Sequence, residues 1–205
     1  MLKVDLHAHD PMVSWDSRSK RKRMLRAYKL FGYDAVGFVG HDKMANVQDD
    51  ELTILNGIEH TENISPEVHI VSYPDQGLRF FAHPRRRSKV NIRKTAQWEM
   101  NKRGININEK YNGGKLQYEG SMNTIELGNS DAHNVFQVDS SYNLIDADNN
   151  PQAIANAVKA GNVDAKRGLR RPFGWVVKRV HASINTREGL QYVDDFLEKE
   201  QRLSR

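Results

Sequence analysis

The chain has 205 residues, carries a formal net charge of +5 and contains no cysteine. Disulfide bonds, thiolate metal ligands and thiol catalysis are therefore excluded, and any metal ion must be held by imidazole and carboxylate groups. No apolar run approaches the roughly 20 residues of a membrane-spanning helix, and the N-terminus has no signal-like apolar segment. We expect a soluble, cytoplasmic protein that folds as one domain over residues 1–205.

The N-terminal half predicts a helix between short strands. Leu2–Leu6 alternates apolar and polar residues, as a strand does. Apolar residues then recur at helical spacing between Met24 and Phe31, with Ser17 as the expected N-cap and Gly32 placed to end the helix. Short apolar runs predict further strands over residues 35–39, 52–58, 68–73 and 80–82. Because some runs are apolar throughout, we expect strands buried on both faces and paired mainly in parallel.

The C-terminal half continues this alternation after a long crossover. Residues 105–122 are polar and rich in turn residues, which predicts a mobile loop or hairpin. A strand is predicted over 124–127, and another ends at Ile145 and begins at Asn129 or Tyr142. Asn150-Pro151 opens a helix that Gly161 ends, and a last helix over about 186–203 is expected to pack on the core. Strands that alternate with helices indicate an α/β fold with an open or closed sheet.

Basic residues gather in three clusters, within residues 18–23, 85–94 and 167–179. Such clusters are typical of proteins with anionic partners, although a basic run is also often a solvated helix face. The second cluster directly follows a histidine, which favours the first interpretation there.

Six of the eight histidines lie at or near the ends of the predicted strands. His7 and His9 are two residues apart in an extended chain, so their side chains point the same way. Strand ends of one polarity share an edge of an α/β sheet, where ligands that are distant in sequence converge. We therefore predict a multinuclear site for Mn, Zn or Fe. Its further members are expected to be His41, Glu59, His69, His83, Asp131 and His133.

These motifs resemble a known family. DLHAHD, VGHD, NGIE, EVHIV, FAHP and NSDAH follow one another in the order and spacing of the PHP phosphoesterases, named for polymerase and histidinol phosphatase. The resemblance runs from Leu2 to about Gly161. It implies a distorted seven-stranded (β/α) barrel with up to three metal ions at the C-terminal ends of its strands.

The resemblance also implies a division of the ligands. A first ion would be held by His7, His9, Glu59 and Asp131. Glu59 would bridge to a third ion that is also bound by His69 and His83, while His41 and His133 would hold the second ion. We expect two or three divalent metal ions.

The second ion needs a carboxylate ligand. Family members often carry an aspartate in a serine-aspartate-glycine context shortly after the HxH pair, and Asp16 in Trp15-Asp16-Ser17 is the nearest match, with Asp10 as the alternative. Gly40 stands where many members have an aspartate before the histidine that corresponds to His41, and Asp42 follows it. Loss of a carboxylate that orients an imidazole would weaken this second site. His60 and His181 receive no role.

The resemblance predicts a metal-dependent phosphoric ester hydrolase, a phosphatase or nuclease. A metal-activated hydroxide would attack phosphorus in line, and an arginine, most plausibly Arg85 rather than Arg86 or Arg87, would offset charge on the phosphoryl oxygens. His133 or a metal-bound water would protonate the leaving group. The basic clusters favour a nucleotide or nucleic acid as the substrate.

Three alternatives have weaker support. A small-molecule phosphomonoesterase, such as a histidinol-phosphatase-like enzyme, would use the same site. A catalytically inactive PHP-like scaffold that binds RNA would be expected to have lost ligands, yet nearly every ligand position is filled. A metal-dependent amidohydrolase usually needs a metal-bridging lysine, for which the sequence offers no convincing candidate.

Overall fold

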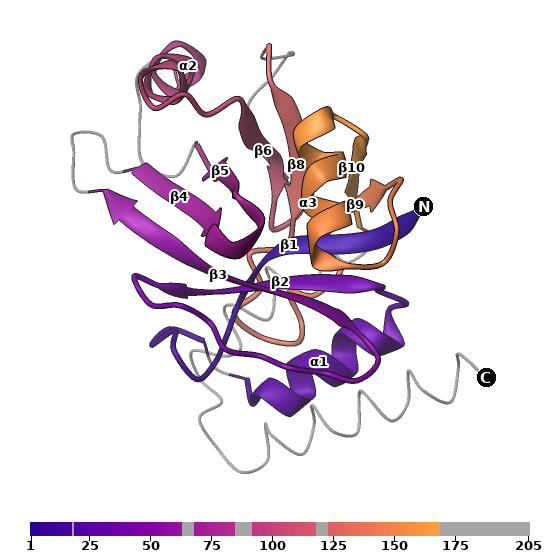
Figure 1. Cartoon of the computed structure of the whole chain (residues 1–205). Helices are drawn as coiled ribbons and strands as arrows, with labels where there is room; N and C mark the ends of the chain where they lie inside the picture. The colour runs from indigo at the N-terminus through magenta and orange to yellow at the C-terminus, as the bar shows by residue number, and fades with distance from the viewer. Residues whose placement is uncertain (18, 63–67, 85–91, 118–122, 169–205) are drawn as a thin grey trace.

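A computed structural model describes residues 1–17, 19–62, 68–84, 92–117 and 123–168 (Figure 1). In these residues three α-helices and a short 3-10 turn accompany ten strands. The helices are α1 (Arg21–Leu30), α2 (Ile92–Lys102) and α3 (Pro151–Ala160), and the turn is η1 (Pro74–Gln76). The strands are β1 (Leu2–His9), β2 (Ala35–His41), β3 (Thr53–Glu62), β4 (Val68–Tyr73), β5 (Leu78–Ala82), β6 (Ile107–Asn112), β7 (Lys115–Leu116), β8 (Ile125–Asn129), β9 (Ser141–Ile145) and β10 (Val163–Arg167).

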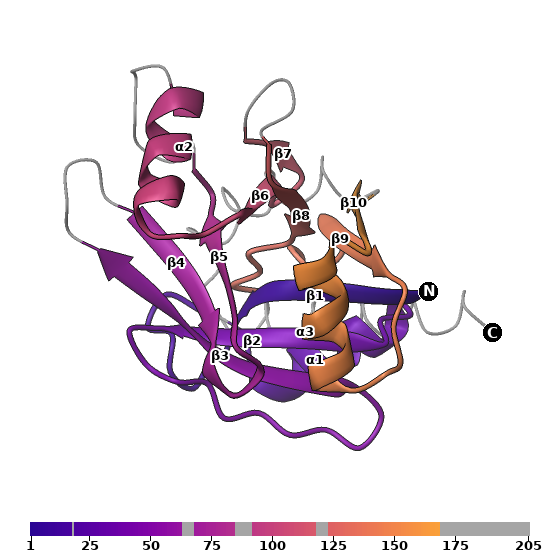
Figure 2. The ribbon, with the colours of Figure 1, turned by 45° about the horizontal axis from the view of Figure 1, so that its top comes forward.

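All ten strands belong to one sheet that is nearly closed (Figure 2). The order is β10-β9-β1-β2-β3-β4-β5-β6-β7, and β8 pairs in parallel with β6. Side chains bridge the remaining seam. Gly128 N donates to Asn143 Oδ1 and Asn143 Nδ2 donates to Gly128 O, both at 2.8 Å, which ties β8 to β9. Leu6 N donates to Asn129 Oδ1 at 3.0 Å, which ties β1 to β8.

The α/β class is confirmed, whereas the prediction of a mainly parallel sheet is wrong. Parallel pairs join β1 to β2, β2 to β3, β5 to β6 and β6 to β8. The pairs β3–β4, β4–β5, β6–β7, β1–β9 and β9–β10 are antiparallel. Between β4 and β5 the reason is the connection, since η1 and Gly77 form a tight turn with no room for a crossover helix. The described part of the chain is therefore strand-rich, and the regular strand–helix alternation of a seven-stranded (β/α) barrel is not what it shows.

Strand β2 shows why its sequence is continuously apolar. Ala35 and Val39 belong to the cluster inside the sheet, whereas Val36 and Phe38 pack under α1 on the outer face. Helix α1 buries Met24, Ala27 and Tyr28 against that outer face. Both faces of β2 are thus covered, as its composition predicts.

The two predicted helices of the described chain differ in how they begin. Asn150 caps α3, because its side-chain oxygen accepts from Ala153 N at 2.9 Å, and Gly161 ends the helix in the left-handed conformation. Helix α1 begins after Lys20 without a side-chain cap, so the prediction of Ser17 as N-cap is wrong. The Ser17 hydroxyl instead donates to His133 O at 3.0 Å, a contact made possible by tertiary structure.

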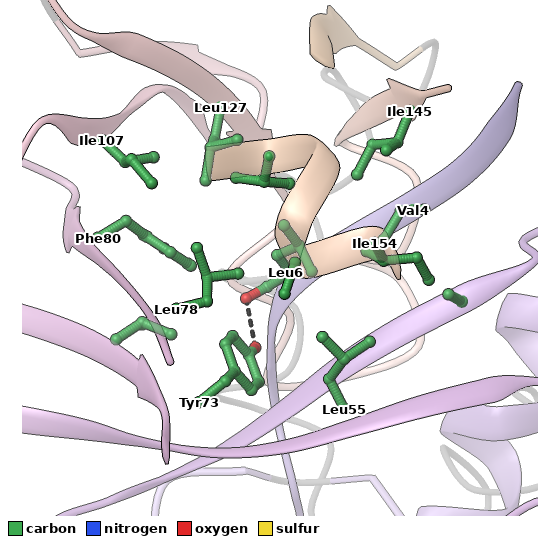
Figure 3. Packing of buried hydrophobic residues seen from close by; sticks show 14 of the residues in the cluster. Val4, Leu6, Leu55, Tyr73, Leu78, Phe80, Ile107, Leu127, Ile145 and Ile154 are labelled. Atoms are coloured by element: carbon green, nitrogen blue, oxygen red, sulfur yellow. Dashed lines mark hydrogen bonds between the residues drawn. The ribbon is translucent and has the colours of Figure 1, made fainter. Parts of the chain in front are cut away.

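The interior of the sheet holds the main hydrophobic core (Figure 3). Tyr73 crosses it and donates its hydroxyl to Leu6 O at 2.6 Å. This crossing requires a glycine in β3, because a Cβ on Gly57 would lie 2.6 Å from the Tyr73 ring. Ile154 and Val158 of α3 enter the same core from one end. The strands that carry the histidine motifs thus belong to a framework with a packed interior.

Residues 105–122 depart most from the sequence prediction. Their described part is largely the paired strand β6 and its hairpin partner β7, joined by Gly113 and Gly114. The hairpin alternative is confirmed for residues 107–116. Helix α2 and strand β10 were not predicted. The expected last helix over about 186–203 and nearly all of the second and third basic clusters lie outside the described residues. None of the helices in the described ranges is long and apolar enough to cross a membrane.

Candidate metal centre

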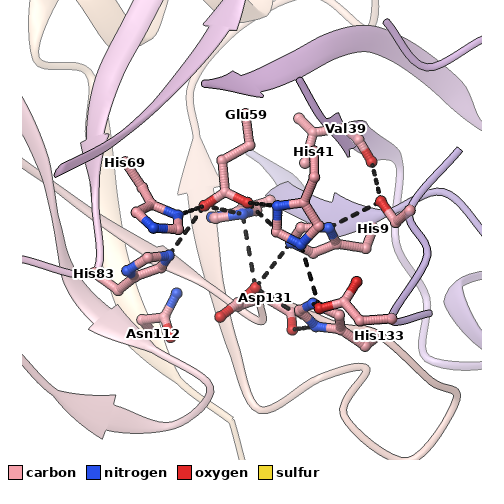
Figure 4. Close-up of polar contacts among 12 residues, drawn as sticks. His9, Val39, His41, Glu59, His69, His83, Asn112, Asp131 and His133 are labelled. Carbon is pink, nitrogen blue, oxygen red and sulfur yellow. Dashed lines mark hydrogen bonds and ion pairs between the residues drawn. The ribbon is translucent and has the colours of Figure 1, made fainter. Parts of the chain in front are cut away.

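The predicted ligands converge at one edge of the sheet (Figure 4). His9 and His41 are the last residues of β1 and β2, and Glu59 lies near the end of β3. His69 lies near the start of β4, which reaches the same edge because β4 runs antiparallel to β3. His83 follows β5. Asp131 and His133 follow β8.

A register shift in β1 turns both histidines of the HxH pair toward this centre. Val4 and Leu6 belong to the interior core, whereas Ala8 packs in the outer cluster under α1. The pairing of β1 with β2 shifts between Asp5 and Ala8. This irregularity places the odd-numbered His7 and His9 on the side that even-numbered residues occupy earlier in the strand.

Glu59 is the central carboxylate. Its Oε1 lies 3.0 Å from both His69 Nδ1 and His83 Nε2, and 3.6 Å from His7 Nε2. Its Oε2 lies 3.1 Å from His41 Nδ1 and 3.4 Å from His9 Nε2. The side chain is fully buried. In Figure 4 it separates His69 and His83 from His41 and His9, the position expected of a bridging ligand.

Asp16 joins the other side of the centre. Its Oδ2 lies 2.9 Å from His133 Nε2 and 3.3 Å from His41 Nε2. Asp10, the alternative carboxylate, is instead buried in an ion pair with Arg21, with Arg21 Nη2 2.7 Å from Asp10 Oδ2. The structure therefore brings Asp16, and not Asp10, to His41 and His133.

The absence of an aspartate at Gly40 has a steric reason. A Cβ there would lie 2.5 Å from Val13 Cγ2 and 2.8 Å from Lys43 O. Any larger residue at position 40 would force the Val13 side chain and the Lys43 backbone to shift. The carboxylate beside His41 thus comes from a neighbouring loop.

Asp131 closes the centre from the β8 side. Its Oδ1 lies 3.1 Å from His9 Nε2 and 3.7 Å from His7 Nε2. Asp131 and His83 both have positive φ angles, 51° and 27°. Non-glycine residues rarely adopt such angles, and they tend to do so where function fixes a side chain.

The donor set fits divalent cations. Three groups have ligand atoms within 4.8 Å of one another, namely His9, Asp16, His41 and His133; His7, His9 and Glu59; and Glu59, His69 and His83. His7 Nε2, Glu59 Oε2 and His133 Nε2 are buried without a hydrogen bond to the described chain, although complementary atoms lie nearby. Buried polar atoms of this kind need a partner, and a cation is one that all three could share. Imidazole and carboxylate donors suit Zn, Mn and Fe.

The charges of the centre are strongly coupled. Burial opposes ionisation of Glu59 and Asp131, yet the surrounding imidazoles outweigh it and hold the pKa of both carboxyls well below the usual range. Burial also opposes protonation of His41, but Asp16 and Glu59 raise its pKa to about 10. Burial lowers the pKa of His9 to about 4. In the metal-free protein, bound protons thus balance the negative charge of the carboxylates, a charge that a cation would otherwise balance.

Two buried carboxylates behind the ligands were missed by the sequence analysis. Glu109 of β6 accepts from His7 Nδ1 at 2.9 Å and from His83 N at 2.8 Å. Asp5 of β1 accepts from His7 N and Ser130 N, both at 3.1 Å, and burial raises its pKa to about 6. The signal for Asp5 is a charged residue inside a buried strand. Glu109 lay in a segment expected to be a loop.

The two residues predicted to be catalytic are Arg85 and His133. Arg85 lies outside the described residues. His133 Nδ1 lies 2.9 Å from Asp131 O and its Nε2 faces Asp16, so both ring nitrogens are directed at groups of the centre. This geometry favours a ligand role for His133. Its role as proton donor stays a prediction.

Comparisons with known proteins agree with this picture. Residues 116–163 match the model of a family described as PHP-associated. None of the curated proteins matches the chain. Among solved structures, the chain is similar to a two-domain protein containing a predicted PHP-like metal-dependent phosphoesterase from Bacteroides vulgatus ATCC 8482. The identity is 17%, the TM-score is 0.57, and the match covers 82% of this chain and 65% of the other.

A second similar structure is PsfC from Pseudomonas syringae PB-5123, with 12% identity and a TM-score of 0.58. That match covers 88% of this chain and 97% of the other. The chain thus spans 65% of the first neighbour and nearly all of the second. The resemblance to the PHP family that the histidine motifs indicate is confirmed by the family match and by the shared fold.

Proposed function

We propose that the chain is a metal-dependent phosphoesterase that hydrolyses a phosphate ester of a nucleotide or nucleic acid. The observation that carries the proposal is the convergence of six histidines and two further carboxylates, Asp16 and Asp131, around the buried Glu59. The first neighbour is described as containing a PHP-like metal-dependent phosphoesterase, which supports the same reaction class.

We assign the ligands as follows. The first ion would be held by His7, His9, Glu59 and Asp131, and the third by Glu59, His69 and His83. The second would be held by Asp16, His41 and His133, in a group that also includes His9. When bound, divalent ions supply positive charge for the phosphoryl oxygens and acidify a coordinated water.

The chain's own contribution is positioning. Glu109 holds the proton of His7 on Nδ1, which leaves Nε2 directed at the centre. Ser14 Oγ lies 3.1 Å from His9 Nδ1 and donates to Val39 O, so it orients the second imidazole in the same way. We keep Arg85 as the candidate for charge stabilisation.

The substrate class rests on the basic residues and on the site chemistry. Lys and Arg side chains favour phosphates, and a polynucleotide would bind with a steep salt dependence that a small monoester lacks. Mn, Zn and Fe are the candidate ions.

A reconstitution assay tests the proposal. The metal-free protein is loaded with Mn²⁺ or Zn²⁺ and assayed for phosphate release from phosphomonoesters, bis-phosphorylated nucleotides and short oligonucleotides. We expect metal-dependent hydrolysis that is lost in His7→Ala and Asp131→Ala. His60→Ala is the matched control, because His60 neighbours Glu59 but is exposed. Unchanged turnover in His7→Ala would exclude the assigned centre.

A further inference from the structure

Trp15 lies uncovered beside the metal centre. Its side chain is 86% exposed, the highest value among the large apolar side chains of the described residues. Its ring centroid lies 6.1 Å from that of His41, with 36° between the ring planes. The next residue is Asp16, which contacts His41 and His133. The exposed indole is therefore separated from the proposed ion positions by the imidazole of His41.

The backbone around Trp15 is held in place although its ring is not. Val13 N and Ser14 N donate to Asp10 O at 3.1 and 2.9 Å, before the tryptophan. After it, the Ser17 hydroxyl donates to His133 O at 3.0 Å. Such anchoring fixes where the indole is presented.

An uncovered indole is costly in water, because burying an aromatic side chain is strongly favourable. The two segments that carry Trp15 and His41 expose further apolar side chains. Met12, on the same loop, is 72% exposed, and Met44, on the turn after β2, is 46% exposed. These two segments pack together where Val13 lies against Gly40. Large exposed apolar side chains beside a polar site are candidates for ligand contact.

We propose that Trp15 is the stacking surface for the base of a nucleotide whose phosphate binds at the metal centre. The inference rests on the proposed function. A nucleotide places a flat aromatic group about one pentose away from a phosphate, which matches an indole next to the ligand His41. A sugar phosphate could pack only its C–H groups on the indole, so probes with and without the base separate the two contacts. Stacking on an aromatic side chain is tolerant of base identity, so the inference names a class and not one base.

Binding of two matched phosphonates tests this assignment. The probes are non-hydrolysable phosphonate analogues of AMP and of ribose 5-phosphate, which differ by the base, and calorimetry gives their dissociation constants for the Mn²⁺-loaded protein. We expect the base to tighten binding roughly tenfold in the wild type, since stacking on an aromatic side chain has about this effect. Trp15→Ala should abolish that preference while ribose analogue binding persists. Trp15→Phe should keep most of it.

Trp98→Ala is the matched control, since Trp98 on α2 is 59% exposed and has Lys102 Nζ 5.0 Å from its ring centroid. It should leave the preference unchanged. If the ratio of the two dissociation constants in Trp15→Ala equals that of the wild type, the assignment of Trp15 as the stacking surface is wrong. An equal loss of preference in Trp98→Ala would also overturn it. If neither probe binds in a metal-dependent way, the proposed function itself fails and the Trp15 assignment falls with it.

Discussion

His7 and Glu109 are joined by a buried hydrogen bond, with His7 Nδ1 2.9 Å from Glu109 Oε1 across 102 residues of sequence. An ionised carboxylate accepts and cannot donate, so the proton of the neutral imidazole resides on Nδ1. His7 Nε2, 3.6 Å from Glu59 and 3.7 Å from Asp131, is left as the ligand atom. Glu109 also accepts from His83 N, where the backbone has a positive φ. One side chain thus positions ligands on two strands.

Glu109→Gln should therefore weaken metal binding without removing a ligand. The amide lacks the charge that favours His7 as a ligand, and its NH₂ group faces hydrogen-bond donors from Asn112 and Asn129. We expect metal affinity to fall by about 10- to 100-fold, the usual effect of losing a carboxylate behind a metal-bound histidine. Competition with a chelator of known affinity measures the change.

Glu126→Gln is the control for this variant. Glu126 of β8 forms an ion pair with Lys110 at 2.5 Å and is partly exposed. The same chemical change there should leave metal affinity within twofold of wild type, about the uncertainty of such a titration. Wild-type affinity in Glu109→Gln would show that His7 needs no such support.

Asp16→Asn should remove one ion and leave the others. Asp16 contacts the imidazoles of the second ion's group alone among the three groups, whereas Glu59 is shared. Neighbouring imidazoles hold the pKa of Asp16 below its usual value against the effect of partial burial, so the carboxylate is ionised at neutral pH. Metal analysis after gel filtration should show one ion fewer per chain than the wild type.

Asp42→Asn provides the comparison. Asp42 follows His41, but its Oδ1 accepts from Thr61 N at 3.1 Å, and asparagine tolerates its φ of 52°. This variant should retain the wild-type metal content. An equal loss of metal in both variants would argue that Asp16 acts through general charge and not as a ligand.

The sequence predicted which residues converge better than it predicted the sheet that carries them. Histidines in different strands converge if they lie at the same edge of the sheet. A strand can bring a histidine to that edge whether it runs parallel or antiparallel to its neighbours. His69 shows the point, because it reaches the centre from the beginning of β4 and not from the end. Periodicity carries no information on strand direction, so the mixed sheet could not be predicted.

Strand β6 was missed for a related reason. Asn108 and Glu109 are polar and buried, and they bond to Thr124, His7 and Asn129 in other parts of the chain. A strand that buries polar residues looks like a loop in a hydrophobicity pattern. Tertiary hydrogen bonds, which no local pattern reports, decide its structure.

Metal uptake should be coupled to proton release. In the metal-free protein the pKa of His41 is raised to about 10 by Asp16 and Glu59 against the effect of burial, so this imidazole is protonated at neutral pH. A ligand imidazole must be neutral, so the ion and the proton compete. Raising the pH removes the competing proton, and apparent affinity should rise by up to about tenfold per pH unit for each proton released, between roughly pH 6 and pH 9.

Calorimetry in two buffers with different ionisation enthalpies counts the released protons. His9, whose pKa burial lowers to about 4, should contribute none in this range. His60→Ala should release the same number as the wild type. An affinity that stays flat with pH, together with heats that do not depend on the buffer, would contradict the coupling.

Tyr73→Phe should destabilise the fold without changing metal content. The Tyr73 hydroxyl donates to Leu6 O at 2.6 Å inside the fully buried core, and phenylalanine would keep the packing but remove the donor. Removing one partner of a buried hydrogen bond costs about 1–3 kcal/mol. Urea denaturation of the metal-free protein should show this decrease in the free energy of unfolding.

Tyr142→Phe is the control, since the ring of Tyr142 contacts Lys3 Nζ at 4.7 Å and phenylalanine preserves that face. Equal stability of Tyr73→Phe and the wild type would mean that the Leu6 carbonyl does not depend on this hydroxyl.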